Sequence, residues 1–338
     1  MKKVLVITFS LVAIIAAAQQ DSKELQETAR NFMNTGDYPN AILVLQKAIQ
    51  IDKKDFELQK DLAMAYYLNR DFANGKEIIK KIIENPEADV QCYQLAGNIY
   101  KAMEEIKDCE RIYKKGLKLF PNSGALYNEY GELLWGKGNS EAIVQWEKGI
   151  ETAPGYSGNY YNAARYYFLT TDKVWALIYG EIFVNIESYS PRTAEIKTLL
   201  LDAYKKFFAN DAALSPKNSK NKDNEFVKAF SDNLNKNIAV IKNGITPQSL
   251  IMLRTRFILD WFEKDAARFP NQLFEHQRQL LQQGMYEAYN QWLFGAADNL
   301  AYYENWIKTH PTEYEQFSKL QRNKLFKFPQ GQYYQKFN

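Results

Sequence analysis

The chain has 338 residues, of which 46% are hydrophobic and 25% are charged. These values are ordinary for a globular protein and exclude a generally disordered chain. The net charge of +3 is too small to indicate a nucleic-acid binder through bulk electrostatics.

The first 18 residues have the pattern of an export signal. Lys2 and Lys3 precede an apolar run from Val4 to Ile15, and Ala16 to Ala18 supply the small residues that a signal peptidase requires. The run is shorter than the ~20 residues that span a bilayer. We expect cleavage after Ala18 and an exported mature chain, periplasmic or secreted, with no transmembrane anchor. A retained N-terminal anchor is the alternative.

A pattern with a period of 34 residues follows, from about residue 22 to residue 190. Each copy contains two helical segments, and each segment has small residues among larger apolar ones at intervals of three and four. That spacing marks one face of a helix. In the first segments the small and large residues are Ala29 and Phe32, Ala63 and Tyr66, Gly97 and Tyr100, Gly131 and Leu134, and Ala164 and Tyr167.

The second segments repeat the same alternation. The first copy has Tyr38, Ala41, Leu45 and Ala48; later copies have Phe72, Gly75, Ile79 and Ile82, then Ile106, Cys109, Tyr113 and Gly116, then Ala142, Trp146 and Gly149, and finally Ala176, Gly180 and Phe183. Small residues are needed where helix axes approach to ~8–10 Å. We therefore expect Ala41 and Ala48 to lie where neighbouring helices touch.

This pattern resembles the tetratricopeptide repeat (TPR) over about residues 22–190, and Pro121 and Pro154 close the third and fourth copies as in that family. The resemblance implies an all-α fold, a right-handed α-solenoid of about five helical hairpins spanning residues 19–190. In proteins of this family the first helices of successive repeats line a concave groove that binds a peptide.

The groove residues should lie one helical turn from the packing residues. By that geometry the candidates for partner binding are Gln26, Arg30 and Met33; Lys60, Met64 and Tyr67; Gln94, Asn98 and Lys101; and Asn128, Glu132, Trp135, Tyr161, Arg165 and Phe168. Amide side chains suit peptide-backbone recognition, because each offers a donor and an acceptor. Trp135, Tyr161 and Phe168 would form an apolar anchor point. Alternatively, Phe168 packs on the helix that follows the repeats.

Two cysteines, Cys92 and Cys109, lie in the third copy. If they occupy the two arms of one helical hairpin, they are staggered by ~7 residues, or ~10 Å along a helix. A disulfide tolerates at most ~7 Å between Cα atoms. We therefore expect two free thiols.

After the repeats, residues 191–210 form an amphipathic helix that should cap the stack, and residues 211–224 form a polar linker or loop. Residues 225–338 predict further helices and suggest no family. Thr246-Pro247 should start a helix that reaches Phe269-Pro270. Later helices are expected over residues 271–295, from residue 299 to 308, and again after Pro311.

The C-terminal half is rich in aromatic residues, with 19 among residues 251–338. Most should belong to the core, because large rings bury the most area; an aromatic surface that binds peptide or glycan is the alternative. Charge also divides unevenly. Residues 19–190 carry 20 basic and 25 acidic side chains, and residues 191–338 carry 21 and 15. Attraction between the halves, contact with an acidic envelope surface, or a solvated helix face would each explain this division.

The sequence indicates no catalytic, cofactor or metal site. The two histidines, His276 and His310, lack the spacing that places two metal ligands on one helical face. Arg256, Asp260 and Lys264 follow one another at one-turn intervals, which usually means helix support.

Two functions remain open. The first is a non-catalytic exported scaffold or adaptor that binds a protein or peptide in the groove. The second is an envelope-associated factor that binds or processes glycan or peptidoglycan, with its site in the C-terminal half.

Overall fold

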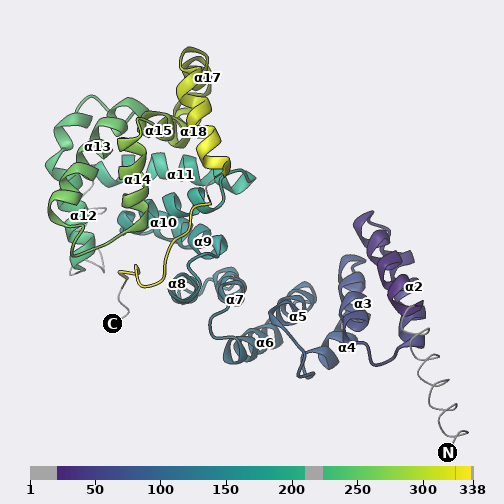
Figure 1. Cartoon of the computed structure of the whole chain (residues 1–338). Coiled ribbons are helices and arrows are strands. Elements are labelled where there is room, and N and C mark those ends of the chain that lie inside the picture. Colours follow the sequence, from purple (N-terminus) through teal and green to yellow (C-terminus); the bar gives the residue numbers. More distant parts are fainter. Residues whose placement is uncertain (1–20, 210–223, 324, 336–338) are drawn as a thin grey trace, which may run out of the picture. The chain divides into compact units, whose positions relative to one another are not determined.

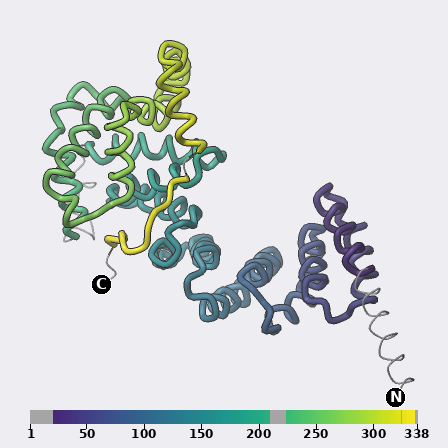
Figure 2. The backbone as a smooth tube through the Cα atoms, in the orientation of Figure 1, coloured from purple at the N-terminus to yellow at the C-terminus, as the bar shows by residue number. Residues whose placement is uncertain are grey.

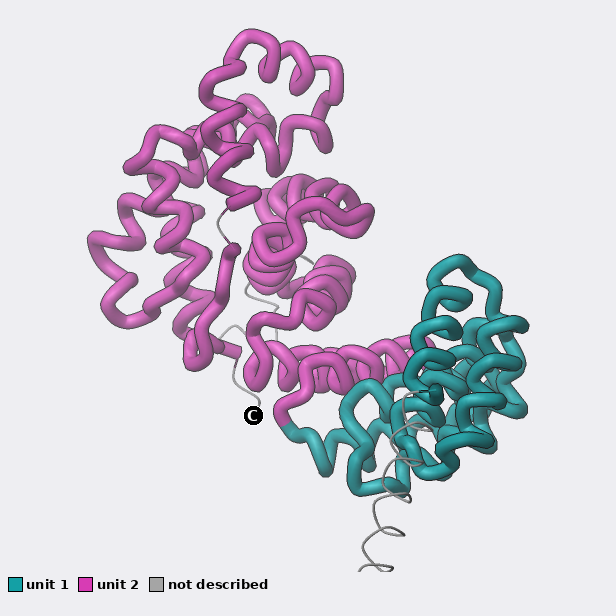
Figure 3. Tube along the Cα trace, turned by 45° about the vertical axis from the view of Figure 1, so that its right-hand side comes forward, with its two compact units in different colours: residues 1–121 teal, residues 122–338 magenta. Residues whose placement is uncertain are grey.

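The computed structural model describes residues 21–209, 224–323 and 325–335, and within these ranges the chain folds into helices without a β-strand. The chain divides into two compact units, residues 1–121 (unit 1) and residues 122–338 (unit 2) (Figure 3). Residues 1–20 and 210–223 lie outside the description, so the export signal and most of the expected linker do too.

Unit 1 consists of three helical hairpins (Figure 1). Residues 21–34 are helical and pair with α2 (Tyr38–Ile51); α3 (Phe56–Leu68) pairs with α4 (Phe72–Ile82), and α5 (Val90–Ala102) pairs with α6 (Ile106–Leu119). Aspartates start these helices: Asp37, Asp55, Asp71 and Asp89 each accept a hydrogen bond from a backbone N–H of the first turn.

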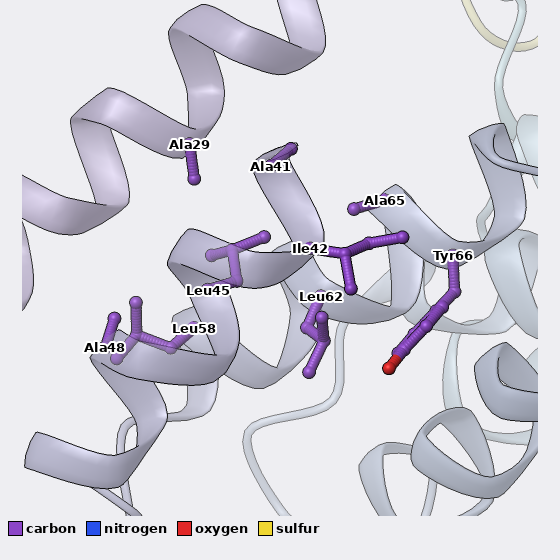
Figure 4. Close-up of a cluster of buried hydrophobic side chains, with 9 residues drawn as sticks. All are labelled: Ala29, Ala41, Ile42, Leu45, Ala48, Leu58, Leu62, Ala65 and Tyr66. Carbon is purple, nitrogen blue, oxygen red and sulfur yellow. The ribbon is translucent and has the colours of Figure 1, made fainter. Parts of the chain in front are cut away.

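The small residues of the repeat lie where helices touch, as the sequence predicts. Ala41 and Ala48 have no exposed surface, and they pack with side chains of the preceding helix and of α3 in the cluster shown in Figure 4. At Gly97, a Cβ atom would lie only 2.3 Å from the ring of Tyr113. The hairpin therefore admits no larger residue without moving that ring.

The two cysteines are buried free thiols, as the helical stagger predicts. The Cys109 thiol donates to the backbone carbonyl of Gly97 across the α5–α6 hairpin, at 3.3 Å.

Unit 2 begins with the last two hairpins. They are α7 (Gly124–Gly136) with α8 (Ala142–Thr152), and α9 (Ser157–Phe168) with α10 (Lys173–Ile186); α11 (Pro191–Phe208) follows. The five hairpins confirm the predicted repeat fold. The rest of unit 2 comprises α12 (Glu225–Lys236), the 3₁₀ turn η3 (Ile238–Ile241), α13 (Pro247–Lys264), α14 (Gln272–Gln282), α15 (Tyr286–Asn290), the π-helical turn η4 (Gln291–Gly295), α16 (Ala296–Asp298), α17 (Leu300–Thr309) and α18 (Pro311–Asn323) (Figure 2).

Helix α10 is the centre of unit 2. Every residue from Lys173 to Asn185 is buried, and α10 contacts α9, α11 and α12. A helix buried on all sides needs neighbours on all sides, so the fourth and fifth hairpins share one core with the C-terminal helices. The repeat pattern ends near residue 190, but no packing boundary coincides with that position.

A buried ion pair joins the repeats to the C-terminal helices. Arg254 of α13 donates to Glu181 of α10, and both side chains are at most 3% exposed. Gln277 and Tyr289 also donate to Glu181, at 2.8 and 2.7 Å. Most of the C-terminal aromatic residues surround this network as core, for example Trp261 and Phe294.

Two predicted helix boundaries were wrong. The expected helix 271–295 is interrupted by Gly284, whose φ of +70° turns the chain between α14 and α15. Helix α13 ends at Lys264 rather than near Phe269. The helices expected from residue 299 and after Pro311 are confirmed as α17 and α18.

Candidate functional site

A cavity of about 320 Å³ opens among α7, α8, α9 and α11 of unit 2. Its lining combines aromatic and apolar side chains from the repeats with polar ones, most of them from α11. The lining residues are Trp135, Trp146, Asn162, Arg165, Tyr166, Phe168, Leu169, Glu195, Thr198, Leu199 and Asp202. The volume is at the lower end of the range for pockets that bury a small ligand.

Three aromatic rings form one wall. The Trp146 side chain is buried, and its Nε1 donates to the backbone carbonyl of Asn128 at 3.3 Å. Trp135 and Tyr166 pack against it at centroid distances of 6.0 and 6.5 Å, and against each other at 5.5 Å. Trp135 is nevertheless 41% exposed. It therefore offers a fixed apolar surface to solvent, a common property of residues that dominate binding energy.

An amide network supports the polar wall. Asn162 donates from Nδ2 to Asn128 Oδ1 at 2.9 Å and to Glu132 Oε1 at 3.1 Å, and Asn128 donates to the same carboxylate oxygen at 3.0 Å. These bonds link the first helices of the fourth and fifth hairpins. They fix the side chain of Asn162 where it borders the cavity.

An ion pair borders the cavity between α9 and α11. Arg165 Nε lies 3.1 Å from Glu195 Oε1, and the Tyr161 hydroxyl donates to Glu195 Oε2 at 2.7 Å. Both members of the ion pair are nearly half exposed, so the pair itself contributes at most about 1 kcal/mol. Its main effect is to hold the Arg165 guanidinium at the cavity edge.

Phe168 lies at the opposite end of the cavity, against basic side chains. Lys206 Nζ is 4.0 Å and Lys173 Nζ 5.8 Å from its ring centroid. Burial, with the nearby charge of Lys206, lowers the pKa of Lys173 to about 8. Phe168 both lines the cavity and packs against a side chain of α11, so both interpretations of this residue hold in part.

The structure distributes the thirteen predicted groove residues in three ways. Trp135, Arg165 and Phe168 line the cavity, while Asn128, Glu132 and Tyr161 hold its lining residues in place. The others lie in unit 1: Arg30, Met33, Lys60, Met64, Tyr67, Asn98 and Lys101.

Two of the unit 1 residues connect successive repeats. Arg30 Nε pairs with Asp61 Oδ2 at 2.8 Å, and Lys60 Nζ with Asp89 Oδ2 at 2.7 Å. Burial opposes the charge of Lys60, but the hydrogen bond to Asp89 outweighs it and raises the pKa of Lys60. These two side chains are used to join hairpins.

Sequence reasoning missed the contribution of α11, because the helix was taken for a cap. Helix α11 packs on both α9 and α10, as the first helix of a further repeat would. Shifting the repeat by one more period would have indicated Glu195, Thr198 and Asp202 as groove residues. Asn162 was missed by one position, because the adjacent Tyr161 was chosen.

The remaining candidates for chemistry have structural partners. Asp260 accepts from Lys236 Nζ at 2.7 Å and from Asn237 Nδ2 at 2.9 Å. The His310 ring stacks on Trp306, and the His276 ring packs edge-on against Tyr289. Over residues 21–209, 224–323 and 325–335, no group of three or more His, Cys, Asp or Glu residues could hold a metal ion.

In the same described ranges, no helix is both long and apolar enough to cross a membrane.

No family model matches the chain, and no curated protein matches it. Similar solved structures are TPR proteins that cover about half of the chain. YrrB, described as a TPR protein with an unusual peptide-binding site, is 18% identical, covers 57% of this chain and 97% of its own, and has a TM-score of 0.40. PilF of Pseudomonas aeruginosa is 14% identical and covers 58% of this chain and 89% of its own, with a TM-score of 0.49.

A thermophilic TPR protein of Thermus thermophilus is 13% identical, covers 54% of this chain and 99% of its own, and has a TM-score of 0.42. These likenesses concern the fold alone. The repeat assignment rests on the five hairpins themselves.

Proposed function

We propose that this protein is a non-catalytic interaction scaffold that binds a peptide segment of a protein partner in the cavity of unit 2. The observation that carries the proposal is Trp135, a ring fixed by Trp146 and Tyr166 yet 41% exposed beside a cavity of about 320 Å³. A preformed aromatic surface loses little conformational entropy on binding, which favours affinity.

The lining fits a peptide with an apolar anchor residue. Trp135, Phe168 and Leu199 provide apolar contacts, whereas Asn162 and Arg165 offer hydrogen bonds at fixed positions. The charges at the edge are paired within the chain, Arg165 with Glu195 and Asp202 with Lys205. An uncharged anchor side chain avoids breaking these pairs.

A peptide library displayed on phage tests the proposal. Wild-type protein should enrich peptides that the double variant Trp135→Ala, Arg165→Ala does not retain. Leu259→Ala is the matched control, since Leu259 is 60% exposed on α13 and lies outside the cavity. Equal retention by both variants would contradict the proposal.

Soluble glycan fragments test the other function. If they quench tryptophan fluorescence equally in wild type and in the double variant, a glycan site in the C-terminal helices is favoured instead.

We also propose that the protein is exported to the periplasm or secreted, on the basis of residues 1–18. The mass of the protein isolated from its own cells checks this. A chain that begins at Gln19 is expected, and an intact Met1 would contradict export by cleavage.

A further inference from the structure

Residues 325–335 form an extended C-terminal segment that lies on the helices of unit 2 (Figure 2, yellow). Two of its aromatic rings are anchored there. Phe328 packs against Tyr160 of α9 at a centroid distance of 6.3 Å, and Tyr334 stacks on Phe226 of α12 at 4.7 Å. Such ring pairs contribute about 0.5–1.5 kcal/mol beyond the area that they bury.

Hydrogen bonds hold the same segment at both sides. Towards the repeats, Gln330 donates to the backbone carbonyl of Thr152 at 3.1 Å, and Gln335 donates to the Tyr167 hydroxyl at 2.6 Å. Towards the C-terminal helices, Gln332 accepts from the backbone N–H of Gln272 at 2.5 Å, and Tyr334 donates to the carbonyl of Pro270 at 2.5 Å. The segment thus joins α8 and α9 to the region between α13 and α14.

The bond from Gln335 leads to a buried carboxyl group. The Tyr167 hydroxyl, which accepts from Gln335, donates to Glu147 Oε1 at 2.6 Å, and Glu147 of α8 is 1% exposed. The other titratable groups around it are Tyr166 of α9, Tyr179 of α10, Asp172 before α10 and Tyr333 of the segment. No basic side chain among the described residues forms an ion pair with Glu147.

Burial therefore dominates the titration of Glu147. It raises the pKa of this carboxyl to about 8, although hydrogen bonds from Tyr167, Gln335 and Tyr179 favour the charged form. Part of this burial is provided by the segment, because Tyr333 and Gln335 both interact with Glu147. When the segment detaches, water reaches the carboxyl group and its pKa falls towards the ordinary range.

We propose that residues 325–335 are a proton-linked clasp, which closes over α8 and α9 when Glu147 is protonated and loosens when it ionises. The direction follows from linkage. The closed state binds the proton more tightly than the open state, so closure is favoured at low pH. It weakens as the pH rises from the ordinary carboxyl range to about 8, and it is constant above that.

The clasp acts on the helices that build the cavity wall. Glu147 is the sequence neighbour of Trp146, and Tyr167 packs edge-on against Tyr166 at 5.5 Å. Trp146 and Tyr166 line the cavity. Opening the clasp therefore removes support from the buried side of that wall. The clasp itself is independent of any ligand, and it stands or falls separately from the proposed peptide binding.

Hydrogen exchange of the full chain tests the clasp. Protection of residues 325–335, corrected for the intrinsic exchange rate, is measured from about pH 5 to about pH 9 in wild type and in Glu147→Gln. In wild type the opening equilibrium should increase by up to about tenfold per pH unit below pH ~8 and then level off. In Glu147→Gln it should not change with pH.

Two controls separate clasp opening from unfolding. Protection of α13 in the same samples reports on the fold, and Tyr334→Ala should lower the protection of the segment at every pH because the ring contact with Phe226 is lost. The proposal is overturned if wild-type protection does not depend on pH. It is also overturned if Glu147→Gln shows the same dependence as wild type.

Discussion

Replacing Gly131 by alanine should destabilise unit 2, although alanine is the better helix former. A Cβ atom at residue 131 would lie 2.3 Å from Nε1 of Trp146, which is buried and donates to the Asn128 carbonyl. The ring has to move, and overpacking of this kind costs about 1–3 kcal/mol. Loss of the indole hydrogen bond adds about 1 kcal/mol. The gain in helix propensity offsets at most about 1 kcal/mol.

Gly136→Ala in the same helix is the matched control. Nothing lies within 4 Å of a Cβ atom at residue 136, so this change should be neutral or stabilising by up to about 1 kcal/mol. All six tryptophans lie in unit 2, so urea unfolding followed by tryptophan fluorescence reports on that unit. We expect Gly131→Ala to lose about 1–3 kcal/mol, or roughly 2–4 °C in Tm per kcal/mol. If both variants are equally stable, the small residue is not needed for helix contact.

Three further predictions concern the core. Arg254→Met should lower the free energy of unfolding by about 3–5 kcal/mol, because Glu181 is left as a buried charge without its cation; a loss below about 1 kcal/mol in urea unfolding would contradict this. Burial lowers the pKa of Lys197 to about 7, so the folded state holds this proton less tightly than the unfolded chain does. Lys197→Met should therefore stabilise more near pH 6 than near pH 10, and the opposite order in thermal melts would refute it. Burial also raises the pKa of Cys92 to about 11. Ellman's reagent should label Cys92 and Cys109 only after unfolding, and rapid labelling of the native protein would be the contrary result.

The repeat half of the fold could be predicted because one physical requirement recurs in it. Wherever two helices approach closely, a small residue must face a large one, and the sequence repeats that pair every 34 residues. Gly180, which departs from the repeat pattern, follows the same rule. A Cβ atom there would lie 2.9 Å from Leu200 of α11, so the glycine makes room for the next helix.

The C-terminal helices were predicted less well, because no repeat constrains them. Gly284 lies within a long amphipathic pattern, and periodicity alone does not show that it takes a positive φ. The clasp has no periodicity to detect, since its contacts are single side chains such as Tyr334 on Phe226. Long-range pairs of this kind leave no local signal in the sequence.

About half of the candidate site could be predicted. Trp135, Arg165 and Phe168 were found because they lie one turn from the packing residues of α7 and α9. Glu195 and Asp202 were not found, because α11 follows the last recognised copy and was assigned a capping role. The cavity forms only when α11 packs beside α9, which is a tertiary contact.

Site-specific photo-crosslinking tests the central claim most directly. A benzoylphenylalanine is placed at Leu169, which lines the cavity and is 68% exposed, or at Leu259, which is 60% exposed on α13. A peptide selected on the wild-type protein should crosslink from residue 169 and not from residue 259. Crosslinking from residue 259 alone, or from both positions equally, would show that the peptide binds outside the cavity of unit 2.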